Sequence, residues 1–340
     1  MIRVEDVRKR AARVLPETSF QRYGDSPTIR SYTDWPAFED AMRLPVSSGS
    51  VSGVVRRDTL TSFSFDPSQN RMLAYHFANL PAAFVANDDT VVLRSEADMF
   101  ALQHVLFCVN GERNITIRDL ASDGPKSTTL DVLVHPGASL QMKILVSGDF
   151  PQYLHVRYHL GNDSTLSVQS VVLGKNAHAH HEFFLNGSSS SLHYAGASIR
   201  GRSDVITDAF VRGSNNTVRL SHALFSAEGD FLVHRGVIRV DRTSTGTDAD
   251  MDSAFYTTGG LAVSVPTLEV LTDDVRRASH CSRDLSLGEE QMLYLQTRGL
   301  SESEILDLYV SSLLEHYAGE LKDEEIVRYA IRSFSESIQR

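Results

Sequence analysis

Four glycine-led turns recur at a nearly constant interval along the middle of the chain. They are Gly137-Ala-Ser-Leu140, Gly161-Asn-Asp-Ser-Thr-Leu166, Gly187-Ser-Ser-Ser-Ser-Leu192 and Gly213-Ser-Asn-Asn-Thr-Val218. Their glycines are separated by 24, 26 and 26 residues, and each turn leads into a short segment of alternating apolar and polar residues. A constant period of this size predicts the stacked coils of a solenoid, because each coil buries its apolar face only against its neighbours.

The alternation of apolar and polar residues runs from about residue 85 to 270 and has the two-residue period of strands. The alternative is a β-sandwich whose hairpins happen to have similar lengths. No two-residue Asn-Gly or Asp-Gly loop joins consecutive strands of the repeat, since Asn186-Gly187 is followed by four serines, and this favours the solenoid.

Helical spacing is expected at both ends of the chain. Val4, Val7, Ala11 and Val14 share one face of a predicted helix over residues 3–15. Near the other end we expect three helices that begin near the capping boxes Ser286–Glu289 and Ser301–Glu304 and near Asp323. These helices could cap the open end of the solenoid, or they could form a docking platform for a partner.

Composition excludes several classes of protein. The chain has 340 residues, is 41% hydrophobic and carries a net charge of −10, so it can build a sizeable core and is unsuited to general nucleic-acid binding. We expect no membrane span and no secretory signal. Two cysteines, Cys108 and Cys281, make no disulfide framework and favour a reducing, cytoplasmic setting.

Motifs for nucleotide hydrolysis, dinucleotide binding and zinc-dependent proteolysis are absent from the sequence, so we predict no catalytic activity for the chain. A carbohydrate-cleaving enzyme on a parallel β-helix is a weaker alternative, because its groove would need carboxylates and basic residues from several coils. Here the coils present Ser, Asn and His instead.

Three segments contain metal-ligand side chains. His178 and His180 would share one strand face, with His181 beside them, and could hold zinc or form a polar ladder. Adjacent His280 and Cys281 combine an imidazole with a soft thiol, which suits iron–sulfur, zinc or copper chemistry unless Cys281 is simply buried. The alternating carboxylates that include Asp250 could bind a cation or solvate a strand edge.

The stretch from about residue 230 to 317 resembles the SufB/SufD family of iron–sulfur cluster assembly proteins. The resemblance rests on blocks in a matching order, of which the most specific is the run at 288–300: His234-Arg235-Gly236-Val237-Ile238, Gly246-Thr247-Asp248-Ala249, Pro266-Thr267-Leu268-Glu269-Val270, Ser279-His280 and Gly288-Glu289-Glu290-Gln291-Met292-Leu293-Tyr294-Leu295-Gln296-Thr297-Arg298-Gly299-Leu300. Met251 falls where SufB has its cluster cysteine, so the chain is closer to SufD or to a minimal SufB/D-like protein.

The resemblance implies a mainly β fold: a right-handed parallel β-helix at 85–282, between a helical and irregular region at 1–80 and a helical subdomain at 283–340. It implies a non-catalytic scaffold that builds a transient 4Fe–4S or 2Fe–2S cluster at a dimer interface. The partners implied are a SufC-type ABC ATPase and either a second copy or a SufB-type paralogue. The alternative is a purely structural partner of the ATPase that holds no cluster.

Site residues follow from the same resemblance. His280 falls on the histidine that both paralogues share near the interface, so it inherits a role as cluster ligand. Cys281 falls where SufB has a glutamate and SufD a glycine, and a thiolate there would be at least as good a ligand. Asp250 and Glu269 are further candidates. Dimer contacts are expected at Val265, Pro266 and Leu268, and contacts with the ATPase at Glu289, Tyr294, Arg298 and Leu308. A two-fold axis near His280 and Cys281 would supply two imidazoles and two thiolates, which is a full set of four ligands.

Overall fold

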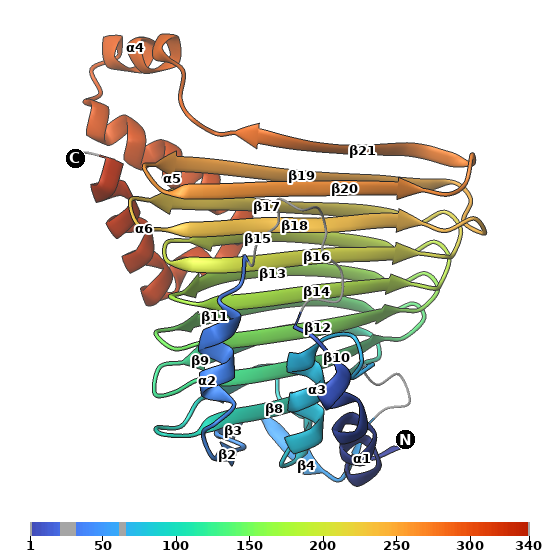
Figure 1. The fold of residues 1–340 in the computed structure, drawn as a ribbon. Coiled ribbons are helices and arrows are strands. Elements are labelled where there is room, and N and C mark those ends of the chain that lie inside the picture. Colours follow the sequence, from blue (N-terminus) through green and yellow to red (C-terminus); the bar gives the residue numbers. More distant parts are fainter. Residues whose placement is uncertain (1, 21–31, 61–65, 339–340) are drawn as a thin grey trace.

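Successive strands alternate between two facing parallel sheets in the computed structural model, which describes residues 2–20, 32–60 and 66–338 (Figure 1). Along most of the chain, each strand pairs with the strands two before and two after it. Val156, for example, lies opposite Leu130 of the preceding coil and His181 of the following coil. The chain is therefore a parallel β-solenoid of about eight turns, which confirms the prediction from the glycine period.

One of the two sheets contains only even-numbered strands, and the other contains only odd-numbered strands. The ten-stranded sheet contains β2 (Val46–Ser47), β4 (Val54–Arg57), β6 (Ala83–Ala86), β8 (Phe100–Val109), β10 (Lys126–Val134), β12 (Gln152–Leu160), β14 (Ala177–Leu185), β16 (Arg202–Val211), β18 (Phe231–Val240) and β20 (Leu261–Val270). The nine-stranded sheet contains β3 (Ser50–Ser52), β7 (Thr90–Arg94), β9 (Glu112–Ala121), β11 (Ser139–Gly148), β13 (Thr165–Gly174), β15 (Ser191–Ile199), β17 (Thr217–Ala227), β19 (Thr247–Thr258) and β21 (Val275–Asp284).

The core lies between the two sheets. Alternate residues of every coil point inward, so Leu130, Val156 and Val205 of one sheet pack in the same apolar cluster as Ile144 and Val168 of the other. All five side chains are fully buried. Residues between them point outward, which gives each sheet an outer face on which functional groups can stand.

Three of the four repeat glycines, Gly161, Gly187 and Gly213, are required by the tight stacking of the turns. A side chain at Gly213 would collide with the carbonyl oxygen of Gly187 one coil below, and a side chain at Gly187 would collide with the backbone of Gly161. The buried side chain of Asn216 connects two successive coils by hydrogen bonds. Its Nδ2–H donates to Gly187 O (2.9 Å), and its Oδ1 accepts from Ser190 N (2.8 Å). The period in the sequence is thus the period of these close backbone contacts.

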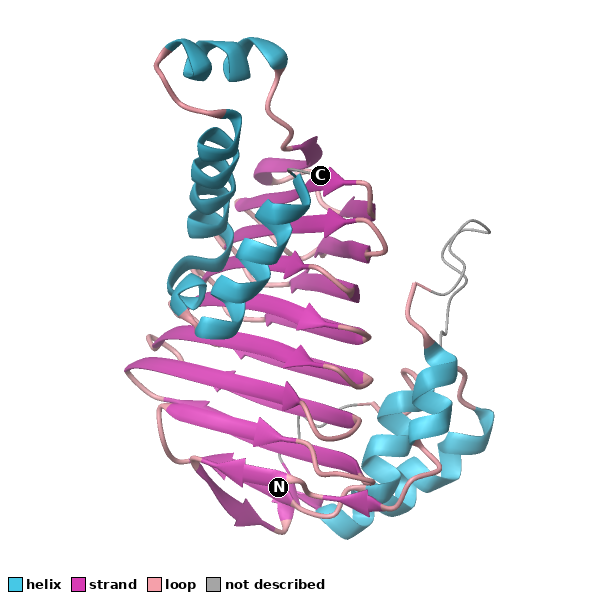
Figure 2. Cartoon of the chain, turned by 90° about the vertical axis from the view of Figure 1, so that its left-hand side faces the viewer, coloured by secondary structure: helices cyan, strands magenta, loops and turns pink. Residues whose placement is uncertain are grey.

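N-terminal helices cover part of the outer face of the ten-stranded sheet (Figure 2). The elements are α1 (Val4–Val14), the short 3-10 helix η1 (Leu15–Glu17), α2 (Trp35–Ala41) and α3 (Arg71–Asn79), and the strands β1 (Ile2–Arg3) and β5 (Thr59–Leu60) pair beside them. The first helix matches its predicted span to within one residue. Asn70 caps α3, because its Oδ1 accepts from Leu73 N at 2.9 Å.

The C-terminal region is helical, and all of its helices except the first cover the outer face of the nine-stranded sheet. The helices are α4 (Glu289–Thr297), α5 (Glu302–Ala318), the 3-10 helix η2 (Gly319–Asp323) and α6 (Glu325–Ile338). Val310 of α5 and Phe334 of α6 lie in one apolar cluster with Val171 and Ala223 of the sheet. These helices therefore pack on the flat side of the solenoid, whereas α4 projects past its last coil (Figures 1 and 2).

The helix starts agree only partly with the expected capping boxes. Ser301 caps α5 as predicted, with its backbone N–H donating to Glu304 Oε2 at 2.8 Å. Ser286 does not cap α4, because its backbone N–H and hydroxyl bond to Asp284 and the helix begins at Glu289. Within the described residues, every helix is too short or too polar to cross a lipid bilayer.

Candidate functional site

Both sheets terminate at the same end of the solenoid. In the part of the chain that the structure describes, β20 pairs only with β18 and β21 pairs only with β19, so each presents one unpaired edge. Unpaired N–H and C=O groups on an edge strand are a template for pairing with another chain. Pro266 lies within β20, and a residue without an N–H fits an edge position.

The residues expected at a dimer interface all lie on β20, but they do not share one face. Pro266 and Leu268 point toward the interior, and Leu268 packs against the core cluster. Val265 lies on the outer face, where it lines a groove. All three side chains are half-buried, while Leu261 at the start of the strand is 55% exposed.

His280 lies on the inner side of β21 and remains exposed because no further coil covers it. Its Nδ1–H donates to the carbonyl oxygen of Pro266 on β20 at 2.9 Å. A neutral imidazole that donates through Nδ1 keeps its lone pair on Nε2, which is the form that binds a metal. His280 is thus oriented by the neighbouring edge strand.

Cys281 is the next residue along β21, and its side chain points to the opposite, outer face of the sheet. Its thiol donates to Asp252 Oδ1 at 3.2 Å, and Arg283 forms an ion pair with the same carboxylate. Partial burial, followed by the hydrogen bond and charge of Asp252, raises the pKa of the Cys281 thiol. In a chain without a second subunit, the side chain of Cys281 is therefore a protonated thiol.

Asp250 and Glu269 stand apart from His280. Asp250 is on the outer face of the nine-stranded sheet, where it accepts from Ser279 and contacts Arg277 at 3.4 Å. Glu269 is on the outer face of the ten-stranded sheet, paired with Arg239 at 3.2 Å. A single chain therefore does not bring the four predicted ligands together, because strand alternation distributes them over three surfaces.

The residues expected to contact the ATPase are exposed on helices. Tyr294 of α4 is 55% exposed and Leu308 of α5 is 60% exposed. Arg298 stacks on the Tyr294 ring at 5.1 Å and donates to its hydroxyl at 2.9 Å, and Glu289 opens α4. Exposed large apolar side chains of this kind indicate an interaction surface when they cluster.

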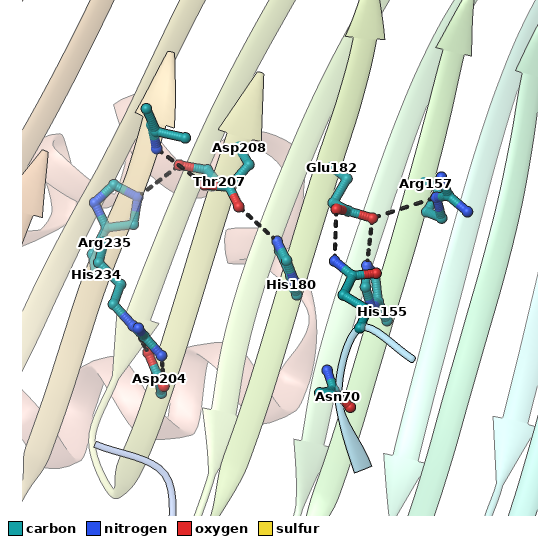
Figure 3. A network of polar contacts seen from close by, with 12 residues as sticks. Asn70, His155, Arg157, His180, Glu182, Asp204, Thr207, Asp208, His234 and Arg235 are labelled. Carbon is teal, nitrogen blue, oxygen red and sulfur yellow. Dashed lines mark hydrogen bonds and ion pairs between the residues drawn. The ribbon is translucent and has the colours of Figure 1, made fainter. Parts of the chain in front are cut away.

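The histidine-rich strand β14 divides between two environments. His181 points into the core beside the Tyr158 hydroxyl (3.2 Å), whereas His178 and His180 stand on the outer face of the ten-stranded sheet. The structure places His155 of the preceding coil directly beside His180, with ring centroids 4.4 Å apart, and Glu182 next to both (Figure 3). We did not predict His155; the signal was its spacing of 25 residues from His180, one coil of the solenoid.

The charge states of this outer-face group are set by burial and by its neighbours. Burial, followed by the charge on His180, lowers the pKa of His155 to about 3. Burial opposes the charge of His180, but a hydrogen bond to Asp208 raises the pKa of His180 overall. Burial likewise opposes ionisation of Glu182, yet His155, His180 and Arg157 together hold the pKa of Glu182 below its usual range.

Comparisons with known proteins point to one family. The family model described as "SUF system FeS cluster assembly, SufBD core domain" matches residues 92–312. An iron–sulfur cluster assembly SufBD family protein of Staphylococcus haemolyticus is 23% identical over 218 residues, which cover 63% of this chain and 42% of that protein. A protein of the same description from Staphylococcus aureus strain USA300 is 25% identical over 173 residues, covering 50% of this chain and 35% of that protein.

The chain thus matches about two fifths of the length of the first of these relatives. The match covers the solenoid from β7 to β21 and extends into α5, and it includes both edge strands. The matched segment is well over half of the 340 residues. The chain belongs to the SufBD family of iron–sulfur cluster assembly proteins, as the blocks between residues 230 and 317 predicted.

Proposed function

We propose that this chain is a non-catalytic, cytoplasmic scaffold on which an iron–sulfur cluster is assembled at a subunit interface formed by β20 and β21. Family membership supports a role in iron–sulfur cluster assembly. The observation that carries the finer proposal is that both sheets end in unpaired edge strands, one of which bears His280 and Cys281. The subunit that completes the interface is a second copy or a SufB-type paralogue.

In this scaffold His280 and Cys281 supply ligands in pairs across the interface. Their side chains project from opposite faces of β21, so one chain cannot direct both at one iron ion. A second subunit adds the missing ligands, since an ordinary cluster needs four. Ligation by Cys281 requires displacement of the hydrogen bond from its thiol to Asp252, because the thiolate is the form that binds metal.

Anaerobic reconstitution with ferrous iron and sulfide tests this assignment. The full chain, alone or with a SufB-type paralogue, is expected to acquire the visible absorption and Mössbauer signature of a 4Fe–4S or 2Fe–2S cluster. His280→Ala and Cys281→Ser are each expected to lose most of that cluster, because each removes a ligand in both copies of a homodimer. Cys108→Ser is the matched control, as Cys108 is on β8 at the other end of the solenoid.

The same experiment tests the alternative function. Full cluster loading in both variants would remove these residues from the site. Absence of any cluster in the unaltered protein, with and without the paralogue, would favour a purely structural partner of the ATPase.

The helical tail is proposed to bind the SufC-type ATPase through α4 and the adjacent face of α5. Tyr294→Ala and Leu308→Ala are expected to weaken binding by at least tenfold each, since truncating a central aromatic or apolar contact costs more than about 1.4 kcal/mol. Titration calorimetry with the purified ATPase measures the loss. Val55→Ala, an exposed apolar site (46%) on β4 far from the tail, is the control, and equal affinity of all variants would contradict the docking site.

A further inference from the structure

A groove of about 570 Å³ lies over the outer face of the ten-stranded sheet, on the far side of the solenoid from α5 and α6. Strands β14, β16, β18 and β20 form its floor, and Trp35, Gln69 and Asn70 from the N-terminal region line it as well. His180 and Glu182 lie in its floor. The groove reaches edge strand β20 through Val265, Thr267 and Glu269, but His180 and Glu182 lie on β14, which β16 and β18 separate from that edge.

Three ligand-type side chains converge beneath this groove. His155, His180 and Glu182 each offer one ligand atom, and these atoms all lie within 4.8 Å of one another. His155 and His180 are register partners on β12 and β14, and Glu182 follows His180 by two residues on the same face. His155 Nε2 and Glu182 Oε2 are hydrogen-bonded at 2.8 Å, and a metal ion bound between them would replace this hydrogen bond.

Each of the three ligands is held by a second layer of polar groups (Figure 3). His180 Nε2 lies 2.9 Å from Asp208 Oδ2, and the other oxygen of Asp208 accepts from the backbone N–H of Val237 at 3.0 Å. Ligand histidines in metal centres usually donate their second nitrogen to a carboxylate, carbonyl or other oxygen, which fixes the ring. Asp208 is placed to do this for His180.

The other two ligands are supported from the N-terminal region. The Tyr153 hydroxyl lies 3.3 Å from His155 Nδ1 and accepts from Asn70 Nδ2 at 2.9 Å. Gln69 Nε2 donates to Glu182 Oε1 at 2.9 Å. Arg157 also contacts Glu182, at 3.3 Å.

We propose that His155, His180 and Glu182 bind one divalent transition metal ion, in a mononuclear site separate from the cluster interface. Two imidazoles and one carboxylate from one face form the donor set that suits ferrous iron and leaves open coordination positions toward the groove. Zinc accepts the same donors. This site is separate from the proposed scaffold function, because its ligands lie on β12 and β14. Strands β16 and β18 lie between β14 and the edge strand β20.

Metal titration of the metal-free full-length chain tests the proposal. Calorimetry with Zn²⁺, and anaerobic titration with Fe²⁺, are each expected to show one equivalent bound, and Co²⁺ is expected to produce visible d–d absorption. His155→Gln, His180→Gln and Glu182→Gln are expected to weaken this binding by on the order of 100-fold. Asp208→Asn, which keeps the side chain's shape but changes the support of His180, is expected to weaken it by roughly 10- to 100-fold.

His193→Ala is the matched control, as His193 is an exposed histidine on the outer face of the opposite sheet. The proposal fails if the unaltered chain binds none of the three ions at micromolar concentration. It also fails if binding survives in folded Glu182→Gln and His180→Gln chains, or disappears equally in His193→Ala. Competition between Fe²⁺ and Zn²⁺ at the single site identifies which ion it prefers.

The proposed metal site and the proposed cluster ligands are tested with different variants. Cluster loading is measured on His280→Ala and Cys281→Ser, and mononuclear binding is measured on Glu182→Gln without added sulfide. If the unaltered protein binds the single metal ion but assembles no cluster, only the cluster proposal is contradicted. If it assembles a cluster but binds no single metal ion, only the metal-site proposal is contradicted.

Discussion

Lowering the pH from 7.5 to 5.5 is expected to reduce the free energy of unfolding by roughly 5–7 kcal/mol. The cause is a set of fully buried histidines that the native structure keeps neutral. Burial is the largest influence on each: it lowers the pKa of His104, His181 and His234 to about 3 and holds those of His76 and His222 well below their usual value. The neutral rings bond to uncharged hydroxyl groups, as His234 does to Ser253 (2.8 Å) through Nδ1 and to Thr207 (3.0 Å) through Nε2.

The direction follows from proton binding. In the unfolded chain these imidazoles have a pKa near 6.5, so as the pH falls below about 6.5 the unfolded state binds more protons than the folded state. The stabilisation is therefore complete above pH 6.5 and is lost as the pH falls, by about 1.4 kcal/mol per histidine for each pH unit. Since domains of this kind are stable by only about 5–15 kcal/mol, the solenoid is expected to be labile in mild acid.

Urea unfolding at a series of pH values measures this slope. His222→Asn removes one of the buried rings and is expected to lower the slope by about one proton, whatever it does to stability at pH 7.5. His316→Asn, on an exposed turn of α5, is the matched control. A free energy of unfolding that stays constant from pH 7.5 to 5.5 would show that the buried histidines already take up protons in the folded chain.

Lys126→Met is expected to destabilise the fold by about 3–5 kcal/mol. Lys126 is fully buried at the start of β10, where its ammonium lies 2.6 Å from Asp119 Oδ1 and donates to the carbonyl oxygen of Leu93 at 2.9 Å. Burial lowers the pKa of Lys126, and the adjacent carboxylate of Asp119 opposes that shift. Removing the ammonium leaves a buried carboxylate without its counter-charge, which is the costly half of breaking such a pair.

The double variant Lys126→Met with Asp119→Asn separates the lost ion pair from a simple packing defect. It is expected to recover at least half of the loss, because the neutral amide no longer needs a counter-charge and its oxygen can still accept from Thr128 (2.8 Å in the native chain). Lys175→Met removes an exposed ion pair with Asp149 and should leave the unfolding midpoint unchanged within error. Chemical denaturation of all three variants measures these differences; equal midpoints for Lys126→Met and Lys175→Met would disprove the argument.

The fold was largely predictable because its information is local and periodic. Stacked turns tolerate only glycine at positions such as Gly187 and Gly213. The number of residues between these glycines is therefore the number of residues in one coil. The N-terminal helix and the start of α5 follow from an apolar stripe and a capping box. The predicted start of α4 was wrong, because the Ser286 hydroxyl donates to Asp284 and does not cap the helix.

The candidate sites were predictable only in part. Alternation along β21 places His280 and Cys281 on opposite faces, which the prediction of a joint ligand pair did not take into account. The partners of His180 come from elsewhere: His155 from the preceding coil, and Asp208, which orients its ring, from the next. The N-terminal residues Gln69 and Asn70 reach the same group from more than 80 residues away in the sequence.

The sequence by itself determined the coil period, the two helical ends and the family, because turn stacking and helix capping act between residues near one another in the chain. Only the tertiary structure decided which outer face each helical region covers and which side chains from successive coils meet. The physical reason is that an outward-facing residue on a strand has no local preference for its neighbours. Its partners are chosen by the register between coils, and a change of one residue in that register would move every side chain to the opposite face.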